Sequence, residues 1–224
     1  MIDNQNNQDN KNNPPTITNL DSKPIQIYQQ DITPGAVTQP ALVAGGNQKG
    51  DLYYGMDGIR FSRLAIGTNN QFLTVSSGVP KWSTLATCLA YDTSTQTFTT
   101  GVPANITFNS NTYDPSSLHS TTTNTERILI PYPGIYLVTA FFRWNDNATG
   151  YRILDLYNKA GTLIFQSIGS LDSGGRCSHL VSIHYYSTVA NDYIYLQAVQ
   201  ASGGNLTGIP GYNPLFNLSL VLKT

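Results

Sequence analysis

Charged side chains are scarce in this sequence of 224 residues. Lys and Arg number 12 and Asp and Glu 13, so that 11% of the chain is charged, against roughly 25% in an average soluble domain. The net charge of −1 offers no basic field for nucleic acid or an anionic membrane surface, which normally needs clustered Lys and Arg. We therefore expect neither as a partner.

Residues that favour helices are also scarce. Glutamate occurs once, at Glu126, whereas Asn occurs 21 times, Ser 18 times and Thr 25 times. Asn, Ser and Thr compete with the helix backbone for hydrogen bonds. The composition therefore predicts an all-β protein.

Cysteines and long apolar runs are few. Cys88 and Cys177 are too few for a disulfide framework and lack metal-ligand spacing, so we expect two free, buried thiols in a reducing compartment. The opening MIDNQNNQDN has no basic start followed by an apolar run, and no stretch approaches the ~18 apolar residues of a membrane span. We expect no secretory signal and no membrane insertion.

Residues 1–49 form a polar arm, rich in Asn and Gln and then punctuated by Pro and Gly. Its apolar residues are too sparse to offset the entropy of ordering a core. We expect the arm to anchor the chain to a larger assembly, with Ile25, Ile27 and Tyr28 adding to the sheet edge of a partner. A solitary tail without a partner is the alternative.

Residues 50–84 alternate short apolar groups with turn residues. The groups predict strands at Leu52–Tyr54, Ile59–Phe61, Leu64–Ile66 and Phe72–Val75. One copy of this segment is too short to bury its own apolar side chains. A generic glycine-rich linker would explain the glycines but not the order of the apolar groups.

The pattern GDLYYG…FSRLAIGTNNQFLTVSSGVPKW resembles a short module of bacteriophage fibre proteins, which ends in PxW. It departs from the module at Asn70 and Lys81 without changing the spacing. The resemblance implies a neck in which three chains wrap around one another. The apolar residues that it assigns to this trimeric neck are Leu52, Tyr53, Phe61, Leu64, Ile66, Leu73 and Trp82.

Residues 85–224 contain longer alternating runs separated by turns. In Gly134–Trp144 both faces are largely apolar, so we expect each to be covered, by a second sheet or by another subunit. Eight or more strands in such a segment suit a two-sheet jelly roll. The other predicted strands are Leu85–Tyr91, Arg127–Ile130, Tyr151–Tyr157, Thr162–Ser167, Ser178–Tyr186, Tyr193–Ala201 and Phe216–Leu222.

This segment resembles the globular head of the complement first component and the related tumour necrosis factor fold. The resemblance lies in a P-x-P-G-x-Y signature, Pro131 to Tyr136, and in the closing run FNLSLVLK. It implies a ten-strand jelly roll that trimerises around a hydrophobic axis and presents its outer loops to ligands. An immunoglobulin-like sandwich would instead need a Cys…Trp…Cys spacing that this chain lacks.

The sequence pattern does not predict a cluster of catalytic residues. His179 and His184 are five apart on one predicted strand and so should face opposite ways, and we expect a solvated His119 in its loop. The few carboxylates are scattered, without the converging pair of a glycosidase. We expect no enzyme and no catalytic residue.

Acidic residues in loops raise the question of a structural Ca²⁺ ion. Asp114, Asp146 and Asp172 lie beside Asn and Ser residues, but none has the D-x-D-x-D-G pattern of a calcium loop. Turn chemistry explains them better. We therefore expect no cofactor and no metal.

Several tyrosines fall in predicted loops or at strand ends and suit contact with sugars or proteins. The candidate contact residues are Tyr113, Trp144, Tyr151 and Tyr212; the alternative is that such rings fill the core or the trimer axis. The order of arm, neck and knob (85–224) indicates a homotrimeric head or tail fibre on a bacteriophage virion surface, with a host glycan or protein as ligand. The alternative is a capsid decoration protein without receptor binding.

Overall fold

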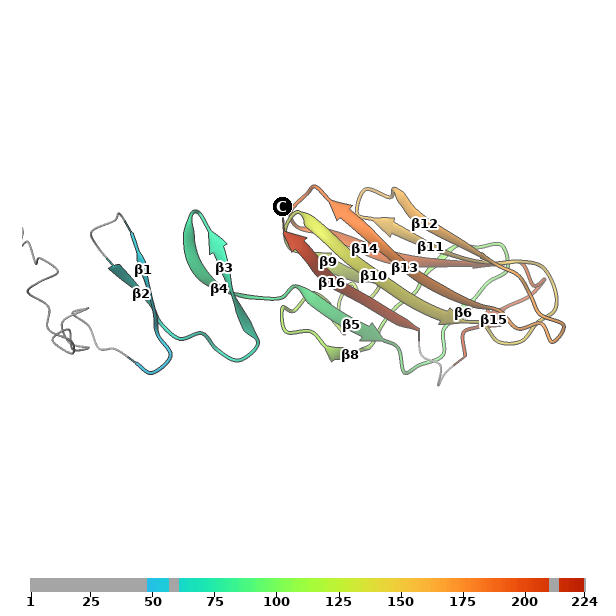
Figure 1. The fold of residues 1–224 in the computed structure, drawn as a ribbon. Coiled ribbons are helices and arrows are strands. Elements are labelled where there is room, and N and C mark those ends of the chain that lie inside the picture. The colour runs from blue at the N-terminus through green and yellow to red at the C-terminus, as the bar shows by residue number, and fades with distance from the viewer. Residues whose placement is uncertain (1–47, 57–60, 210–213, 224) are drawn as a thin grey trace, which may run out of the picture. The chain divides into compact units, whose positions relative to one another are not determined.

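All regular secondary structure in the computed structural model is β-strand, over the residues it describes, 48–56, 61–209 and 214–223 (Figure 1). These ranges hold sixteen strands and no helix, which confirms the all-β prediction. Accordingly, none of the described residues belongs to a helix that could cross a membrane. The chain divides into two compact units, Met1–Ile66 and Gly67–Thr224.

The first unit contains an antiparallel pair, β1 (Leu52–Gly55) and β2 (Phe61–Leu64). The strand expected at Leu52–Tyr54 is confirmed, and most of Ile59–Phe61 lies outside the described residues. The strand expected at Leu64–Ile66 is wrong, because β2 ends at its first residue. Beyond that point the chain is held by a side chain instead of a neighbouring strand.

That side chain is Asp51. Its carboxylate accepts hydrogen bonds from the backbone N–H groups of Gln48, at 2.7 Å, and Ile66, at 2.9 Å, and from Nε of Arg63, at 2.6 Å. These bonds, with that from Gln48 the strongest, hold the pKa of Asp51 below its usual value. One acid therefore ties the start of β1 to the end of β2, which lie at the same end of the pair.

A tight hairpin opens the second unit. β3 (Gln71–Ser76) pairs with β4 (Val79–Thr84) through a two-residue turn, Ser77 and Gly78, both with positive φ. Such a turn matches the twist of the two strands. The strand expected at Phe72–Val75 is confirmed within β3, whereas β4 carries a proline and little apolar alternation and was not expected.

Two larger sheets make up the rest of the second unit (Figure 1). The first sheet has the order β13-β10-β16-β5-β8, where the strands are β13 (Ser178–Ser187), β10 (Gly134–Arg143), β16 (Leu215–Lys223), β5 (Thr87–Tyr91) and β8 (Ser110–Tyr113). The second sheet has the order β12-β11-β14-β7, with β9 also paired to β14; its strands are β12 (Leu163–Gly169), β11 (Arg152–Asn158), β14 (Asp192–Gln200), β7 (Ala104–Asn105) and β9 (Arg127–Ile130). A short pair, β15 (Leu206–Thr207) and β6 (Thr97–Phe98), lies outside both sheets.

Strands that are far apart in the sequence lie side by side in both sheets. The first strand of this region, β5, pairs with the last, β16, and β9 pairs with β14. This order is that of a jelly roll. The ten strands that the described residues place in the two sheets agree with the ten-strand jelly roll that the resemblance implied.

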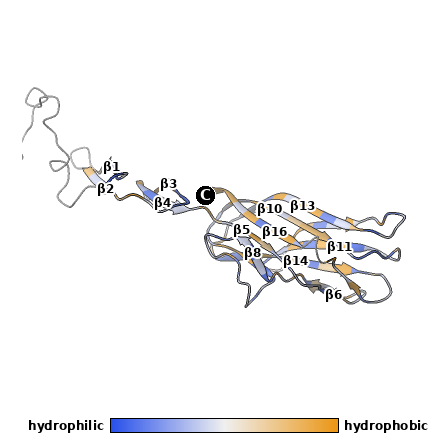
Figure 2. Cartoon of the chain, turned by 90° about the horizontal axis from the view of Figure 1, so that it is seen from below, coloured by the Kyte–Doolittle hydropathy of each residue, from blue (hydrophilic) through white to orange (hydrophobic). Residues whose placement is uncertain are grey.

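The core lies between the two sheets. Along β10, Tyr136, Val138, Ala140 and Phe142 are buried, while the alternate residues are only partly covered. β14 of the second sheet buries Ile194, among other residues, from the other side. Figure 2 shows apolar residues recurring along β10, β13 and β16. The described residues of this unit therefore cover the second face of β10 only in part.

The strands predicted for residues 85–224 are confirmed within two residues at each end. A tight turn joins β11 to β12: the N–H of Gly161 donates to the carbonyl of Asn158 at 2.9 Å, and Gly161 has φ +75°. Positive φ costs glycine little, which explains its place in this turn.

Candidate functional site

The three histidines are the first residues to consider as catalytic bases. His179 and His184 lie on opposite faces of β13, one buried and the other exposed, as predicted. The expected solvated His119 is wrong, because its side chain is only 6% exposed. Its ring nitrogens contact Oδ1 of Asn111 at 2.6 Å and the carbonyl of Thr125 at 3.1 Å, so the loop folds back over it.

A buried Cys–His–Ser cluster was missed from the sequence. Sγ of Cys177 lies 3.6 Å from Nε2 of His179, whose Nδ1 lies 3.0 Å from Oγ of Ser167. Burial raises the pKa of Cys177 and lowers the pKa of His179 to about 4. Both groups are therefore neutral near pH 7, whereas a catalytic pair needs a thiolate. The signal in the sequence was that Cys177 and His179 are two positions apart, which places their side chains on the same side of an extended chain.

The two cysteines are free and buried, as predicted. Cys88 lies on β5 in the core, where burial raises the pKa of its thiol to about 12. Cys177 lies just before β13.

The loop acids mostly close turns. The carboxylate of Asp114 accepts the N–H groups of Leu118 and His119 at 2.8 and 2.9 Å, and Oδ1 of Asp172 accepts the N–H of Gly174 at 2.8 Å. The interpretation as turn chemistry is confirmed for both acids. Asp146 lies 3.8 Å from the guanidinium groups of two arginines. No cluster of three or more metal-ligating side chains occurs among the described residues.

Of the candidate contact residues, Tyr113 and Tyr151 are each 48% exposed. Trp144 is fully buried, so its assignment to a contact surface is wrong: it continues the inward face of β10 and packs edge-on against Phe98 and Phe142. Tyr212 lies outside the described residues, as do the arm residues Ile25, Ile27 and Tyr28.

The predicted neck residues are poorly covered by their own chain. The exposed members are Leu52, Phe61, Ile66 and Leu73, of which Phe61 is 63% exposed, and the partly covered members are Tyr53, Leu64 and Trp82. Each compact unit thus leaves apolar surface uncovered in this part of the chain. The trimeric neck itself stays a prediction.

The outer face of the first sheet carries a group of apolar side chains. The strand registers align Leu180, Phe141, Leu215 and Tyr91 in one row across β13, β10, β16 and β5. Leu180 is 72% exposed. We call this surface the apolar face; its other apolar residues include Ile135, Leu137, Tyr186, Leu89 and Leu222. A polar row, Ser182, Thr139 and Asn217, lies next to it. Exposed apolar side chains gathered in one row favour an interaction surface.

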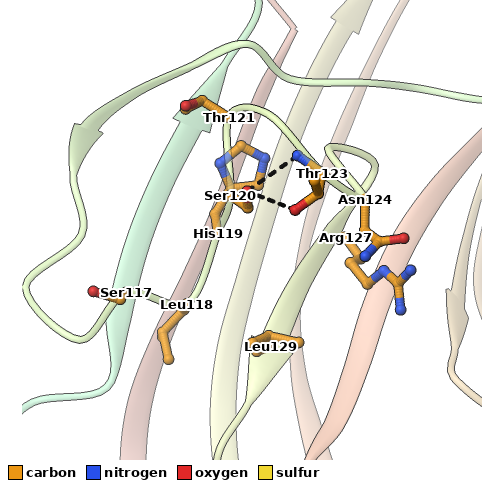
Figure 3. Close-up of a pocket in the computed structure, with 9 residues that line it drawn as sticks. All are labelled: Ser117, Leu118, His119, Ser120, Thr121, Thr123, Asn124, Arg127 and Leu129. Atoms are coloured by element: carbon orange, nitrogen blue, oxygen red, sulfur yellow. Dashed lines mark hydrogen bonds between the residues drawn. The ribbon is translucent and has the colours of Figure 1, made fainter.

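A polar pocket of about 480 Å³ lies between the loop after β8 and strand β9 (Figure 3). Four hydroxyl side chains and an amide line it together with Leu118, His119, Leu129 and Arg127; the five polar residues are Ser117, Ser120, Thr121, Thr123 and Asn124. We call it the hydroxyl pocket. Its volume is within the range of sites for small molecules.

A row of aromatic residues continues from this pocket across the outer face of the second sheet. Tyr157, Tyr195 and Arg127 face one another in register across β11, β14 and β9. The rings of Tyr157 and Tyr195 stack with centroids 5.5 Å apart, and Tyr193 lies 6.2 Å from Tyr195. We call Tyr157, Tyr195 and Tyr193 the tyrosine row.

Comparison with known proteins finds similarity at the level of the fold. No family model matches the chain, and no curated protein matches its sequence. Solved structures that are similar include Eiger TNF from S. frugiperda, with 12% identity over 62% of this chain and 94% of that chain and a TM-score of 0.44. The globular domain of zebrafish complement 1qA has 14% identity over 62% and 99%, with a TM-score of 0.43. Murine APRIL at pH 5.0 has 10% identity over 61% and 99%, with a TM-score of 0.46.

These TM-scores lie below 0.5. The assignment of a two-sheet jelly roll therefore rests on the strand order described above. None of the three structures is a bacteriophage fibre, and that part of the resemblance stays a prediction.

Proposed function

We propose that this chain is a non-enzymatic structural protein of a bacteriophage virion, a homotrimeric head or tail fibre. In this proposal the arm, residues 1–49, anchors the chain to other virion proteins, and the neck, residues 50–84, winds three chains together. The knob, residues 85–224, is presented at the virion surface for attachment to the host. Three observations support the proposal.

The apolar face carries the argument for self-association. The row from Leu180 to Tyr91 contains no charged residue, and most of the Leu180 side chain is exposed to water. Covering such a surface is favourable by about 25 cal/mol per Å² of apolar area. Other copies of the same chain can cover this surface, because they are present wherever the protein is made.

The neck supports the same conclusion. Phe61, Ile66 and Leu73 are exposed, and they occupy apolar positions of the pattern that resembles the fibre module. Contacts with two other chains would bury them, as the resemblance to a fibre module implies.

The absence of catalysis is supported by the chemistry of the buried cluster. Cys177 and His179 are held neutral by burial, and both are withdrawn from solvent. Of the proposed host contacts, Tyr151 remains a candidate outside the apolar face, whereas Tyr113 lies opposite Leu89 at the β8 edge of the first sheet and borders it.

Light scattering on the full chain tests the proposal. The expected mass is three times 24.4 kDa, and a monomer at micromolar concentration would contradict it. Competition then tests attachment: added full chain should reduce adsorption of the phage to its host cells. Stable trimers that leave adsorption unchanged would favour a capsid decoration protein instead.

A further inference from the structure

The hydroxyl pocket has a wall that is fixed before any ligand arrives. Asp114 accepts the backbone N–H groups of Leu118 and His119, and the buried His119 ring lies within hydrogen-bonding distance of Asn111. Ser120 holds the far side of the loop: its Oγ accepts the N–H of Thr123 at 3.2 Å (Figure 3). A preorganised site loses little entropy when it binds.

Two residues of the loop keep a backbone conformation that is costly for side chains other than glycine. Ser117 and Asn124 both have φ of 52° and both line the pocket. Non-glycine residues in this region are uncommon and cluster at ligand-binding segments. One residue in this conformation thus lies on each side of the pocket.

Arg127 is the one cation among the residues that line the pocket. Its Nε donates to Glu126 at 3.2 Å, and its Cζ lies 4.5 Å from the ring centroid of Tyr193. The guanidinium has five N–H donors in a planar fork, which matches a carboxylate. The stacking on Tyr193 and the Glu126 contact hold the guanidinium in place.

The lining therefore combines three recognition elements. Hydroxyl and amide groups suit the many hydroxyls of a sugar, Leu118 and Leu129 supply an apolar contact, and Arg127 supplies one positive charge. Beyond Arg127 the tyrosine row offers amphipathic rings, which are rigid and bind sugar faces at low entropic cost.

We propose that the hydroxyl pocket and the tyrosine row together bind an acidic oligosaccharide. One sugar, with its carboxylate on Arg127 and its hydroxyls toward Ser120, Thr123 and Asn124, occupies the pocket. The next sugars extend over Tyr193 and Tyr195. Use of this site in host attachment rests on the proposed function, but binding by the purified chain does not.

Calorimetric titration of the full chain tests the proposal. The probes are two acidic saccharides, hyaluronan tetrasaccharide and tetragalacturonate, and two neutral ones, cellotetraose and maltotetraose. At least one acidic probe should bind more tightly than both neutral probes. Arg127→Gln should weaken that binding by at least about tenfold, the value of a charge-assisted hydrogen bond. Thr123→Val, which keeps the shape of the side chain, should weaken it by about three- to tenfold.

Arg176→Gln is the control, because Arg176 is a more exposed arginine that lies in the loop before β13 and does not line the pocket. It should leave binding unchanged, and all variants should keep the trimer mass and the melting temperature of the parent within a few degrees. The proposal is overturned if neither acidic probe binds at millimolar concentration, if neutral probes bind equally well, or if both Arg127→Gln and Thr123→Val bind like the parent. Binding without any effect on phage adsorption would remove only the attachment function.

Discussion

Leu180 on β13 lies directly opposite Phe141 on β10, on the outward side of the first sheet. Phe141 is partly covered by the described residues, whereas Leu180 is 72% exposed. Since Val181, the next residue, is buried in the core, the alternation of β13 is regular here. The exposure of Leu180 is thus built into the register of the sheet.

Leu180→Asp should break self-association without unfolding the knob. A carboxylate enclosed by another chain without a partner costs about 3 to 5 kcal/mol, whereas the same substitution in water costs little. Light scattering should show the mass falling from three times 24.4 kDa toward 24.4 kDa, with an unchanged circular dichroism spectrum. Val189→Asp, at an exposed apolar residue in the loop after β13, should stay trimeric. A trimeric Leu180→Asp protein would exclude the apolar face as the interface.

His179 should make the protein less stable in mild acid. Its folded pKa of about 4 is below the ordinary value of 6.5, because burial disfavours the charged form. As the pH falls, His179 therefore takes up a proton in the unfolded chain before it does so in the folded protein. The free energy of unfolding keeps its full value above pH 6.5 and falls as the pH drops toward 4. The loss should reach about 3 kcal/mol. Urea unfolding at pH 7, 5.5 and 4.5 measures it.

The comparison variants for this pH effect are His179→Gln and His184→Gln. The first should flatten the dependence between pH 6.5 and 4, and the second, which replaces the exposed histidine, should leave it in place. The groups in contact with the His179 ring are Cys177 and Ser167, neither of which titrates in that range. An undiminished slope in His179→Gln would assign the effect to other groups.

Both thiols should resist alkylation in the folded protein. Burial raises the pKa of Cys88 to about 12 and raises that of Cys177, so the thiolate is rare at pH 8. Iodoacetamide should modify neither residue over a period that completes the reaction in urea, as read by mass spectrometry. Rapid modification of Cys177 alone would mean that its cluster opens to solvent.

Trp144 should contribute to stability and Tyr151 should not. Trp144→Ala removes a ring packed between Phe98 and Phe142 and should cost about 3 to 5 kcal/mol. Tyr151→Ala, at a half-exposed residue, should change the free energy of unfolding by no more than about 0.5 kcal/mol. Guanidinium unfolding monitored by circular dichroism distinguishes the two. An equal loss of unfolding free energy in the two variants would contradict the burial of Trp144 and the exposure of Tyr151.

The longer strands of the knob could be predicted from alternation because most of them bury one face, whereas the short strands β6, β7, β8 and β15 were not predicted. Gly134–Arg143 is the clearest example, with alternate residues in the core along its whole length. The same signal failed at Val79–Thr84, which pairs with its hairpin partner through backbone hydrogen bonds while its side chains stay mostly outside a core. Where no face is buried, no period appears in the sequence.

The candidate site was harder to predict because it depends on contacts between distant segments. The loop at His119 was interpreted as a solvated segment, and only the fold shows that Asp114 and Asn111 close it around a buried ring. Likewise, the row of Tyr157, Tyr195 and Arg127 exists only in the register of three strands. The error at Trp144 has a simpler origin, since continuing the alternation of β10 by one step would have buried it.

The two sheets of the jelly roll turn chemically different outer faces in opposite directions. The first carries the apolar row from Leu180 to Tyr91, and the second carries the tyrosine row with Arg127 at its border. If copies of the chain join through the first, each assembly keeps three identical tyrosine rows available to solvent. Tethering three weak sites raises the effective concentration at the second and third contacts, so that affinity for a repeating polymer can rise by orders of magnitude without tighter individual sites.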